Sequence, residues 1–316
     1  MSDHPDETPT LSKRRRIIVN DVYPAEEGEY PAEARPLERA VVEDGPPFLQ
    51  VESLSVVFQR NPVLRAIRLT INRGETVAII GESGCGKTVF LKSLIGLIEP
   101  EYRQGNVLFD GNDFYGMTTR QQTRERMRFG FVFQQAALFD SMSIGENISF
   151  PLEQHTMKTD EEMEAIVLRL LAEVGLPPSV HAKRPGELSG GMRKRAGFAR
   201  ALAMGPEVML YDEPTTGLDP IMSDVINELI INTKKQHEVT GIMVTHDMKS
   251  AKKVADRIIM FYPLSRLEPE EPQIIFDGTP EEIDRCRDPR VSQFIRGEAR
   301  ERLMEMTEAY KPQYPE

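Results

Sequence analysis

The segment GESGCGKT, Gly81–Thr88, has the residue types and the spacing of a phosphate site. It fits the pattern G-x-x-x-x-G-K-[ST], directly after a short apolar run and before the apolar helix start VFLKSLIGLI. Its three glycines let the backbone turn so that successive N–H groups converge on an anion, and the following helix start adds its positive end. Lys87 is expected to reach the β- and γ-phosphates of a nucleotide, and the Thr88 hydroxyl is expected to ligate Mg²⁺.

Polar side chains that end apolar strands supply the rest of a nucleotide site. In VMLYDEP, Asp212 can hold the shell of a Mg²⁺ ion and Glu213 can orient an attacking water, about 120 residues after the phosphate loop. In GIMVTHD, the strand-end position of His246 favours contact with the γ-phosphate, although this histidine could also be a capping residue. In GFVFQQ, Gln134 follows an apolar strand and could sense both the metal and the attacking water.

The stretch LSGGM, Leu188–Met192, opens a segment rich in Arg, Lys and Ala that is typical of a helix. A serine and two glycines at a helix start can bind an anion through the Ser189 hydroxyl and the backbone N–H groups of Gly190 and Gly191. Met192 offers no comparable hydrogen bond, so its side chain cannot be indispensable to phosphate recognition.

These groups need a framework that brings strand ends together. Apolar patterns predict strands over 48–58, 76–80, 208–211 and 242–244. Residues 160–174 place apolar side chains at i, i+3, i+4, i+7, i+8 and i+11, which form one face of a helix. Strands that alternate with helices predict an α/β fold with a mostly parallel sheet, interrupted by a helical insertion over about 113–185.

Both ends of the chain differ from this core. Residues 1–47 hold seven prolines and many acidic residues with little apolar periodicity, so this tail is expected to be disordered. Residues 279–316 are expected to form a helical extension. Its short apolar stripe of Val291, Phe294 and Ile295 is either docked on the main domain or exposed for a partner.

The composition excludes several classes of protein. A net charge of −11 and a pI near 5.2 argue against a nucleic-acid partner, because phosphate neutralisation needs a basic face. The two cysteines, Cys85 and Cys286, show neither disulfide nor zinc spacing, which fits a reducing cytoplasm. Cys85 is interpreted as a small residue that fits the loop rather than as a redox switch. No apolar run reaches about 18 residues, so the chain by itself is expected to be soluble.

With these motifs in this order, the chain resembles the ATP-binding cassette (ABC) ATPases from about Phe48 to Gly278. The resemblance implies a P-loop, RecA-like core with a mostly parallel sheet, an antiparallel β subdomain and a helical insertion. It assigns Lys87 and Thr88 to the first Walker motif, Gln134 to the Q-loop, Leu188–Met192 to the signature, Asp212 and Glu213 to the second Walker motif, Asp219 to the D-loop and His246 to the switch.

The same resemblance implies the roles of these residues toward ATP and Mg²⁺. The expected catalytic residues are Glu213, His246 and Gln134, and the expected metal ligands are Thr88, Gln134 and Asp212. Phe58 matches the aromatic that stacks on adenine, although a phenylalanine at a strand end is often core. The expected ATP contacts are Phe58, Gly81, Glu82, Ser83, Gly84, Cys85, Gly86, Lys87, Thr88, Ser189, Gly190, Gly191 and Asp219.

One branch of the family is most similar. Met192 in the signature, QQAALFDSMSIGENISFPL after the Q-loop and DPRVSQFIRG near the C-terminus resemble the Mla/Mce-type ATPases, which drive phospholipid movement between membranes. This resemblance implies two copies that sandwich two ATP molecules and drive a separate transmembrane permease from the cytoplasmic face of the inner membrane. It also implies an Mce-type lipid-binding protein and room for a small regulatory subunit.

Two alternatives stay open. The same ATPase could serve another cargo, such as an amino acid, a lipoprotein or a drug. A nucleotide-gated module without a permease is a different class of protein, but such modules generally show a long coiled-coil insertion or two cassettes in one chain. This chain has one set of motifs and an insertion of about 70 residues.

Overall fold

The structure, a computed structural model, describes residues 15–17, 39–41 and 47–298. The chain divides into two compact units, Met1–Pro46 and Pro47–Glu316. The functional motifs named above all lie in the second unit.

The first unit contains one short pair of strands. β1 (Arg15–Ile17) pairs antiparallel with β2 (Arg39–Val41). Each strand holds a β-branched residue that suits an extended backbone. The rest of the tail lies outside the described residues, and its disorder stays a prediction.

The second unit is built around a six-stranded sheet in the order β12-β11-β5-β10-β9-β8. Neighbouring strands run parallel except β12, which pairs antiparallel with β11. Three central strands, β5, β9 and β10, are buried along their whole length, which explains their continuous apolar sequences. The strands are β5 Thr76–Ile80, β8 Phe129–Val132, β9 Val208–Asp212, β10 Thr240–Thr245, β11 Arg257–Phe261 and β12 Ile274–Gly278.

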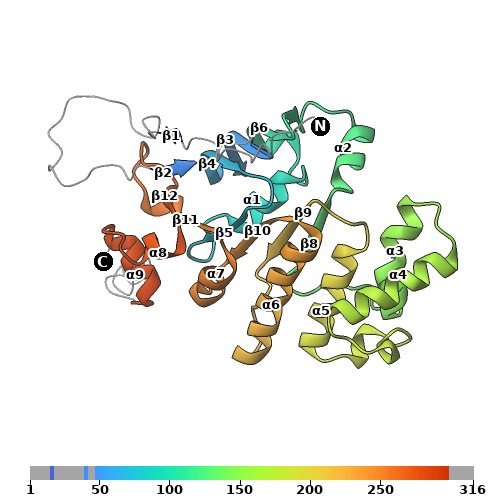
Figure 1. Cartoon of the computed structure of the whole chain (residues 1–316). Helices are drawn as coiled ribbons and strands as arrows, with labels where there is room; N and C mark the ends of the chain where they lie inside the picture. Colours follow the sequence, from blue (N-terminus) through green and yellow to red (C-terminus); the bar gives the residue numbers. More distant parts are fainter. Residues whose placement is uncertain (1–14, 18–38, 42–46, 299–316) are drawn as a thin grey trace, which may run out of the picture. The chain divides into compact units, whose positions relative to one another are not determined.

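Successive residues of these strands face two separate cores. In β5, Ala78 and Ile80 join the core that contains helices α5, α6 and α7, whereas Val77 and Ile79 join the core that contains α1. Figure 1 shows α1 on one side of the sheet and α6 and α7 on the other. These helices are α1 Lys87–Leu94, α5 Gly190–Leu202, α6 Pro220–His237 and α7 Met248–Val254.

A second sheet of four antiparallel strands, in the order β4-β3-β6-β7, shares the core of α1. This sheet is the antiparallel subdomain that the family resemblance implied, and the expected fold class is confirmed. The strands of this sheet are β3 Leu49–Phe58, β4 Asn61–Ile71, β6 Arg103–Phe109 and β7 Asn112–Asp113. The 3₁₀ turn η1 (Pro100–Tyr102) precedes β6, and the helix α2 (Thr119–Arg126) follows β7.

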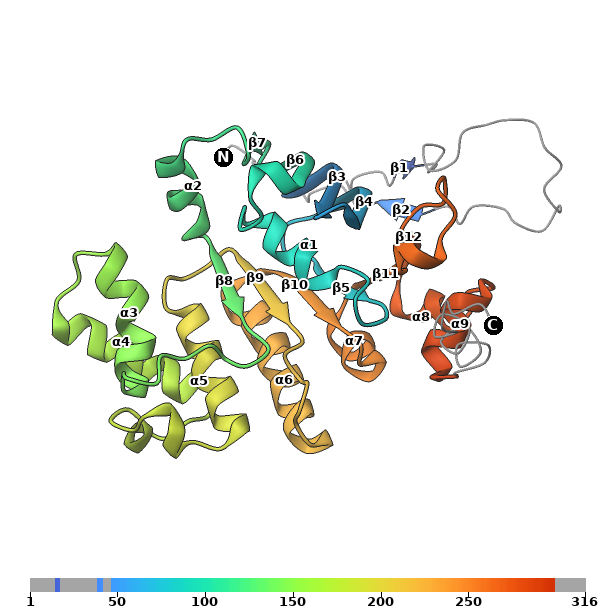
Figure 2. The same ribbon diagram turned by 180° about the vertical axis from the view of Figure 1, so that it is seen from behind.

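Four helical elements lie between β8 and α5, and two of them, α3 and α4, pack on α5 (Figure 2). The four elements are α3 Ile144–His155, α4 Asp160–Glu173, η2 Pro178–Val180 and η3 Pro185–Glu187. The helix expected over 160–174 is confirmed, and its face of Val167, Leu170 and Leu171 is buried. The range expected for the insertion, about 113–185, also contains β8, because the sequence FGFV pairs with β9 in the central sheet. The helices that pack on α5 therefore follow this strand, whereas α2 precedes it.

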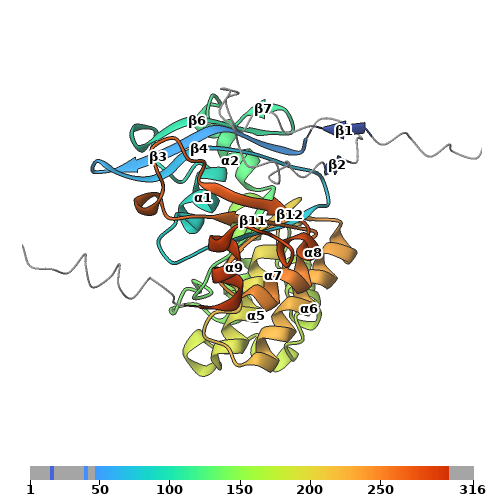
Figure 3. The same cartoon turned by 90° about the vertical axis from the view of Figure 1, so that its left-hand side faces the viewer.

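Two short helices follow β12, namely α8 (Pro280–Ile283) and α9 (Pro289–Arg296) (Figure 3). Val291 is fully buried, and Phe294 and Ile295 pack against the core of α5, α6 and α7. The apolar stripe of α9 is therefore docked on the main domain. No helix within residues 47–298 has both the length and the apolarity needed to cross a bilayer.

Candidate nucleotide site

The loop between β5 and α1 requires glycine at two positions. Gly81 and Gly86 have φ values of 146° and 98°. A Cβ atom on Gly81 would lie 2.3 Å from the carbonyl oxygen of Phe261, and one on Gly86 would lie 2.7 Å from Leu64 Cδ2. Gly86 is the N-cap of α1 and has no side chain that could cap this helix, so the helix start suits an anion.

Lys87 holds its charge inside the loop. Its side chain is 7% exposed, and Nζ donates to the carbonyl oxygens of Gly81 at 2.7 Å and Glu82 at 3.1 Å. Nζ also lies 4.0 Å from Glu213 Oε1. The ammonium group therefore stands where phosphate oxygens can replace the two carbonyls as acceptors.

Thr88 joins the loop to the end of β9. Its hydroxyl donates to Asp212 Oδ1 at 2.8 Å, across 124 positions of sequence. Burial raises the pKa of Asp212, and the hydrogen bond from Thr88 opposes that shift. Hydroxyl and carboxylate oxygens are ligands that Mg²⁺ accepts, and this ion usually takes few protein ligands beside phosphates and water. The pair therefore fits the edge of a Mg²⁺–nucleotide site.

Glu213 is held in place from three directions. Its backbone N–H donates to the carbonyl of Val244 in β10 at 3.0 Å, and its φ of 48° is rare for a residue with a side chain. Its Oε2 accepts from the Thr216 hydroxyl at 3.0 Å and lies 2.8 Å from Nδ1 of His246. Glu213 is nearly buried, whereas His246 is 56% exposed. Unusual backbone conformations cluster at functional sites, and this one aims a carboxylate at the phosphate loop.

Gln134 stands apart from this cluster. The pairing of Val132 with Tyr211 brings it to the sheet edge at which β9 ends, and its side chain is exposed. Among the described residues, no hydrogen bond joins it to Asp212 or Glu213. The structure thus brings together Lys87, Thr88, Asp212, Glu213 and His246, and leaves the role of Gln134 as a proposal.

The signature lies at the start of α5. Ser189 caps the helix by accepting from the Met192 N–H at 3.3 Å, and Ser189 and Gly190 are exposed. A Cβ on Gly191 would lie 2.9 Å from Met222, so this glycine allows α5 to approach α6. Met192 is half-buried and packs against the core. Packing against the core thus explains why an apolar residue stands at this position.

Comparisons with known proteins agree on one family. A family model described as ABC transporter matches residues 64–216. The intermembrane phospholipid transport system ATP-binding protein MlaF of Haemophilus influenzae is 37% identical over 251 residues, which are 79% of this chain and 91% of that protein. The chain belongs to the ABC transporter family. It is an ATP-binding cassette ATPase.

Other relatives extend this assignment. The ribonucleotide transport ATP-binding protein mkl of Mycobacterium tuberculosis is 39% identical over 79% of this chain, and the match spans 66% of mkl. The chloroplastic protein trigalactosyldiacylglycerol 3 of Arabidopsis thaliana is 34% identical over 82% of this chain and 76% of its own length. The ATP-binding cassette MJ0796, solved as a dimer in a post-hydrolysis state with ADP and Pi, has a TM-score of 0.65 and 28% identity over 73% of this chain and 98% of its own.

Three further expected nucleotide residues of this ABC cassette have local partners. Asp219 caps α6, where its Oδ1 accepts from two backbone N–H groups at 3.0 Å. The Phe58 ring packs 5.3 Å from the ring of Tyr102, which is a second aromatic beside the expected adenine position. Cys85 is buried, and burial raises the pKa of its thiol. The thiol form is therefore favoured, as a packing role for Cys85 requires.

Lys194 was not singled out from the sequence, yet it links the signature helix to the loop that follows Glu213. Its Nζ donates to the carbonyls of Pro214 at 2.8 Å and Thr216 at 2.7 Å, just after Glu213. Burial lowers the pKa of this lysine. A lysine within an Arg- and Lys-rich helix gives no sequence signal that sets it apart.

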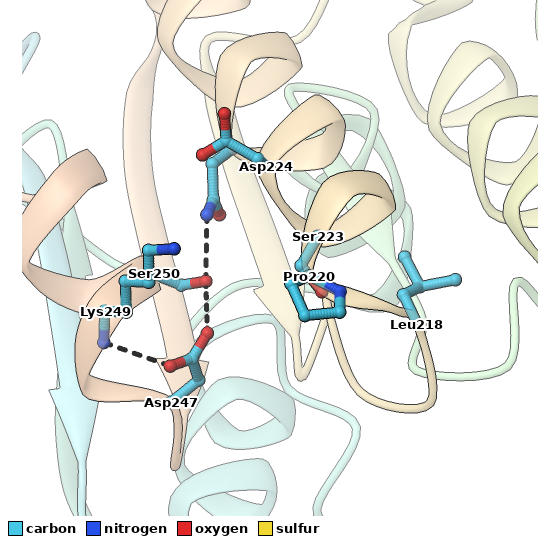
Figure 4. A pocket seen from close by; sticks show the side chains of 8 residues that line it. Leu218, Pro220, Ser223, Asp224, Asp247, Lys249 and Ser250 are labelled. Carbon is cyan, nitrogen blue, oxygen red and sulfur yellow. Dashed lines mark hydrogen bonds between the residues drawn. The ribbon is translucent and has the colours of Figure 1, made fainter.

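A hollow of about 210 Å³ lies beside the switch and the D-loop of the cassette (Figure 4). Leu218 and Pro220 line it where the D-loop enters α6. Across it, Asn227 Nδ2 donates to Ser250 Oγ at 2.9 Å, and that hydroxyl donates to Asp247 Oδ2 at 2.6 Å. This chain of hydrogen bonds ties α6 to the residue directly after the switch histidine.

The packing of Met192 gives a prediction. Met192→Gln should leave ATP turnover within about twofold of wild type, because a half-buried position at a helix start tolerates a side chain of similar length. Steady-state phosphate release by the purified chain measures this. A decrease of more than about tenfold with the fold intact would contradict the packing role.

Proposed function

We propose that this chain is the ATP-hydrolysing subunit of a transporter that moves phospholipid through a separate permease. The observation that carries the ATPase half is the connected cluster of the phosphate loop, Asp212, Glu213 and His246 at one end of the sheet. The cargo half rests on the relatives that the chain resembles over most of its length.

Each residue of the cluster has a separate role in nucleotide binding or hydrolysis. Lys87 and the loop N–H groups bind the phosphates, and the Thr88 hydroxyl and Asp212 hold Mg²⁺, which neutralises charge on the phosphates when bound. Glu213 orients the attacking water and accepts its proton. His246, 2.8 Å from that carboxylate, contacts the γ-phosphate. Gln134 completes the metal and water contacts, and Phe58 stacks on adenine.

Two copies of the chain form the complete site in this proposal. Ser189 and Gly190 are exposed, and among the described residues no hydrogen bond or ion pair joins them to the phosphate loop of the same chain. The dimeric state of MJ0796 supports this arrangement. The signature of one copy then closes over the γ-phosphate held by the other, with Asp219 at the contact between copies.

A mixing experiment tests the paired site. Ser189→Arg and Lys87→Ala should each be inactive, but an equal mixture should recover at most about a quarter of the wild-type rate, since half of the dimers are mixed and each has one intact site of two. Phosphate release is measured after the variants are mixed and re-equilibrated. A mixture as inactive as its parts would contradict the shared site, provided that cross-linking shows mixed dimers.

The share of each relative that the chain matches supports phospholipid as the cargo. The MlaF match spans 91% of a protein named for intermembrane phospholipid transport, and a second relative is named for a galactosylated diacylglycerol. The mkl proteins, named for ribonucleotide transport, are slightly more identical but are matched over 66% of their length. Phospholipid is therefore the first candidate and ribonucleotide the second. An amino acid, lipoprotein or drug has no support among these names.

The permease is proposed to dock beside the Q-loop, on residues 134–151. Phe139 is 43% exposed there, and its ring lies 5.0 Å from that of Phe150, so an apolar surface faces outward. The complex is proposed to sit at the inner membrane, with this chain on the cytoplasmic face. An Mce-type lipid-binding protein and a small regulatory subunit are further proposed partners.

Purification from the native host tests the cargo and the partners. We expect a tagged chain, extracted with detergent from membranes, to bring with it a permease, an Mce-type protein and bound phospholipid. Mass spectrometry of the proteins and lipids reads the result. Recovery of a different permease with no Mce-type protein and no phospholipid would overturn the lipid proposal and leave the ATPase chemistry standing.

A further inference from the structure

The segment 263–273 between β11 and β12, the β11–β12 loop, lies against the phosphate loop. Arg266, in the 3₁₀ turn Leu264–Arg266, pairs with Glu82 at 2.9 Å between Nη1 and Oε1. Only about a fifth of each side chain is exposed. The carbonyl of the same Glu82 accepts a hydrogen bond from Lys87. The β11–β12 loop thus contacts Glu82, whose carbonyl group accepts a hydrogen bond from the Lys87 ammonium group.

Gln273, at the end of this loop, makes the deepest contact. Its side chain is 2% exposed. Oε1 accepts from the backbone N–H of Arg65 at 2.9 Å, and Nε2 donates to the carbonyls of Val63 and Cys85, both at 3.0 Å. One buried amide therefore ties β4 and the phosphate loop to β12. Removing it leaves buried backbone groups without partners, which is costly.

The bond to Cys85 has a geometric consequence for Gly86. The peptide that joins these two residues is planar and trans, so its C=O and N–H groups point in opposite directions. Gln273 holds the carbonyl toward β4, and the N–H of Gly86 must then face away from it. A Cβ atom on Gly86 would lie 2.7 Å from Leu64 Cδ2 and 2.9 Å from the Val63 carbonyl oxygen, so the phosphate loop packs closely on β4 at this residue. Backbone N–H groups at this place in a phosphate loop are the ones that cradle the α- and β-phosphates.

We propose that Gln273 is a positioning residue, which orients the Gly86 N–H toward the bound phosphates, and that Arg266 supports it by fixing Glu82. The proposal rests on the function proposed above, since it concerns the same nucleotide site. Neither residue touches the reacting atoms. Their effect is on how strongly the loop binds phosphate.

The C-terminal helix α9 supports the β11–β12 loop from outside. Arg290 of α9 lies 3.3 Å from Glu271, and the guanidinium groups of Arg290 and Arg266 both lie over the ring of Tyr262, at 5.2 Å and 5.0 Å. The Arg290–Glu271 pair is about a third exposed, and such pairs contribute little. Gln273 therefore carries most of the positioning, and Arg290 is secondary.

The test replaces only the Nε2 group of Gln273, which donates the hydrogen bonds to Val63 and Cys85. Gln273→Glu keeps an oxygen for the Arg65 N–H but puts a second oxygen against the carbonyls of Val63 and Cys85, so the Cys85 peptide is pushed out of place. We expect the Kd for ADP with Mg²⁺, measured by calorimetry on the full chain, to rise about tenfold. In steady-state hydrolysis, KM for ATP should rise more than kcat falls, since Glu213 and His246 are untouched.

Asp277→Asn is the matched control. It makes the reverse exchange, of a carboxylate for an amide, four residues further along the chain in β12, at the end of that strand away from the phosphate loop. There Asp277 holds Arg257 through two hydrogen bonds of 2.6 Å. It should lower thermal stability without changing the Kd for ADP. Arg266→Gln should raise the Kd for ADP about threefold. This second variant tests the proposal if Gln273→Glu does not fold.

The outcomes separate the two proposals. If the wild-type chain binds no ADP, the proposed nucleotide site fails and this inference fails with it. If wild type binds and a folded Gln273→Glu variant keeps the wild-type Kd, or if Asp277→Asn raises the Kd equally, only the positioning role is overturned. If Gln273→Glu does not fold, an unchanged Kd in Arg266→Gln overturns it.

Discussion

Glu213→Gln should keep nucleotide binding and lower ATP turnover about a hundredfold or more, the usual loss when a general base is removed. The amide keeps the shape of the side chain and its bond from Thr216, but it cannot accept a proton from the attacking water. It also loses the charged acceptor beside His246. Phosphate release under saturating ATP measures the change, and ADP calorimetry shows whether binding survives.

Glu207→Gln is the control for this variant. Glu213 directly follows β9, and Glu207 directly precedes the same strand. Hydrogen bonds from Arg128 and Arg73 lower the pKa of Glu207 to about 2. The amide there should weaken stability and leave turnover unchanged. A Glu213→Gln enzyme that hydrolyses ATP at the wild-type rate would falsify the assigned role.

Lys87→Ala should weaken nucleotide binding itself, by about 30-fold or more, because it deletes a charged donor to the phosphates. The Kd for ADP with Mg²⁺ is the measurement. Lys92→Ala, an exposed lysine on the same helix, removes an equal charge and should change the Kd by less than about threefold. Equal losses in the two variants would mean that general charge, and not the loop, binds the nucleotide.

The proximity of most residues in the candidate nucleotide site could be predicted from the sequence, because each of them follows a buried strand. Parallel strands end at one edge of the sheet, so Lys87, Asp212 and His246 had to meet there once β5, β9 and β10 were recognised. The pairing of Thr88 with Asp212 follows from the same geometry. The order of the motifs in the sequence and the order of the parallel strands thus both predict that these side chains meet at one edge of the sheet.

The supporting contacts could not be predicted. Gln273 lies 188 positions from Cys85, in a loop with no motif, and its role depends on a hairpin that brings β12 beside β11. Lys194 contacts carbonyl groups, which any sequence offers. The docking of α9 was open because three apolar residues in a charged helix suit a core and a partner equally, and only the burial of Val291 decides between them.

The chain itself withdraws the Lys87 ammonium group from bulk water, since its side chain is nearly buried and two loop carbonyls accept its hydrogen bonds. Dehydrating an ammonium group is costly, and here that cost falls on folding instead of on ATP binding. Phosphate then only exchanges neutral acceptors for charged ones, which form stronger hydrogen bonds. The loop is therefore preorganised, and any substitution that lets Lys87 swing into solvent should weaken ATP binding with the lysine still present.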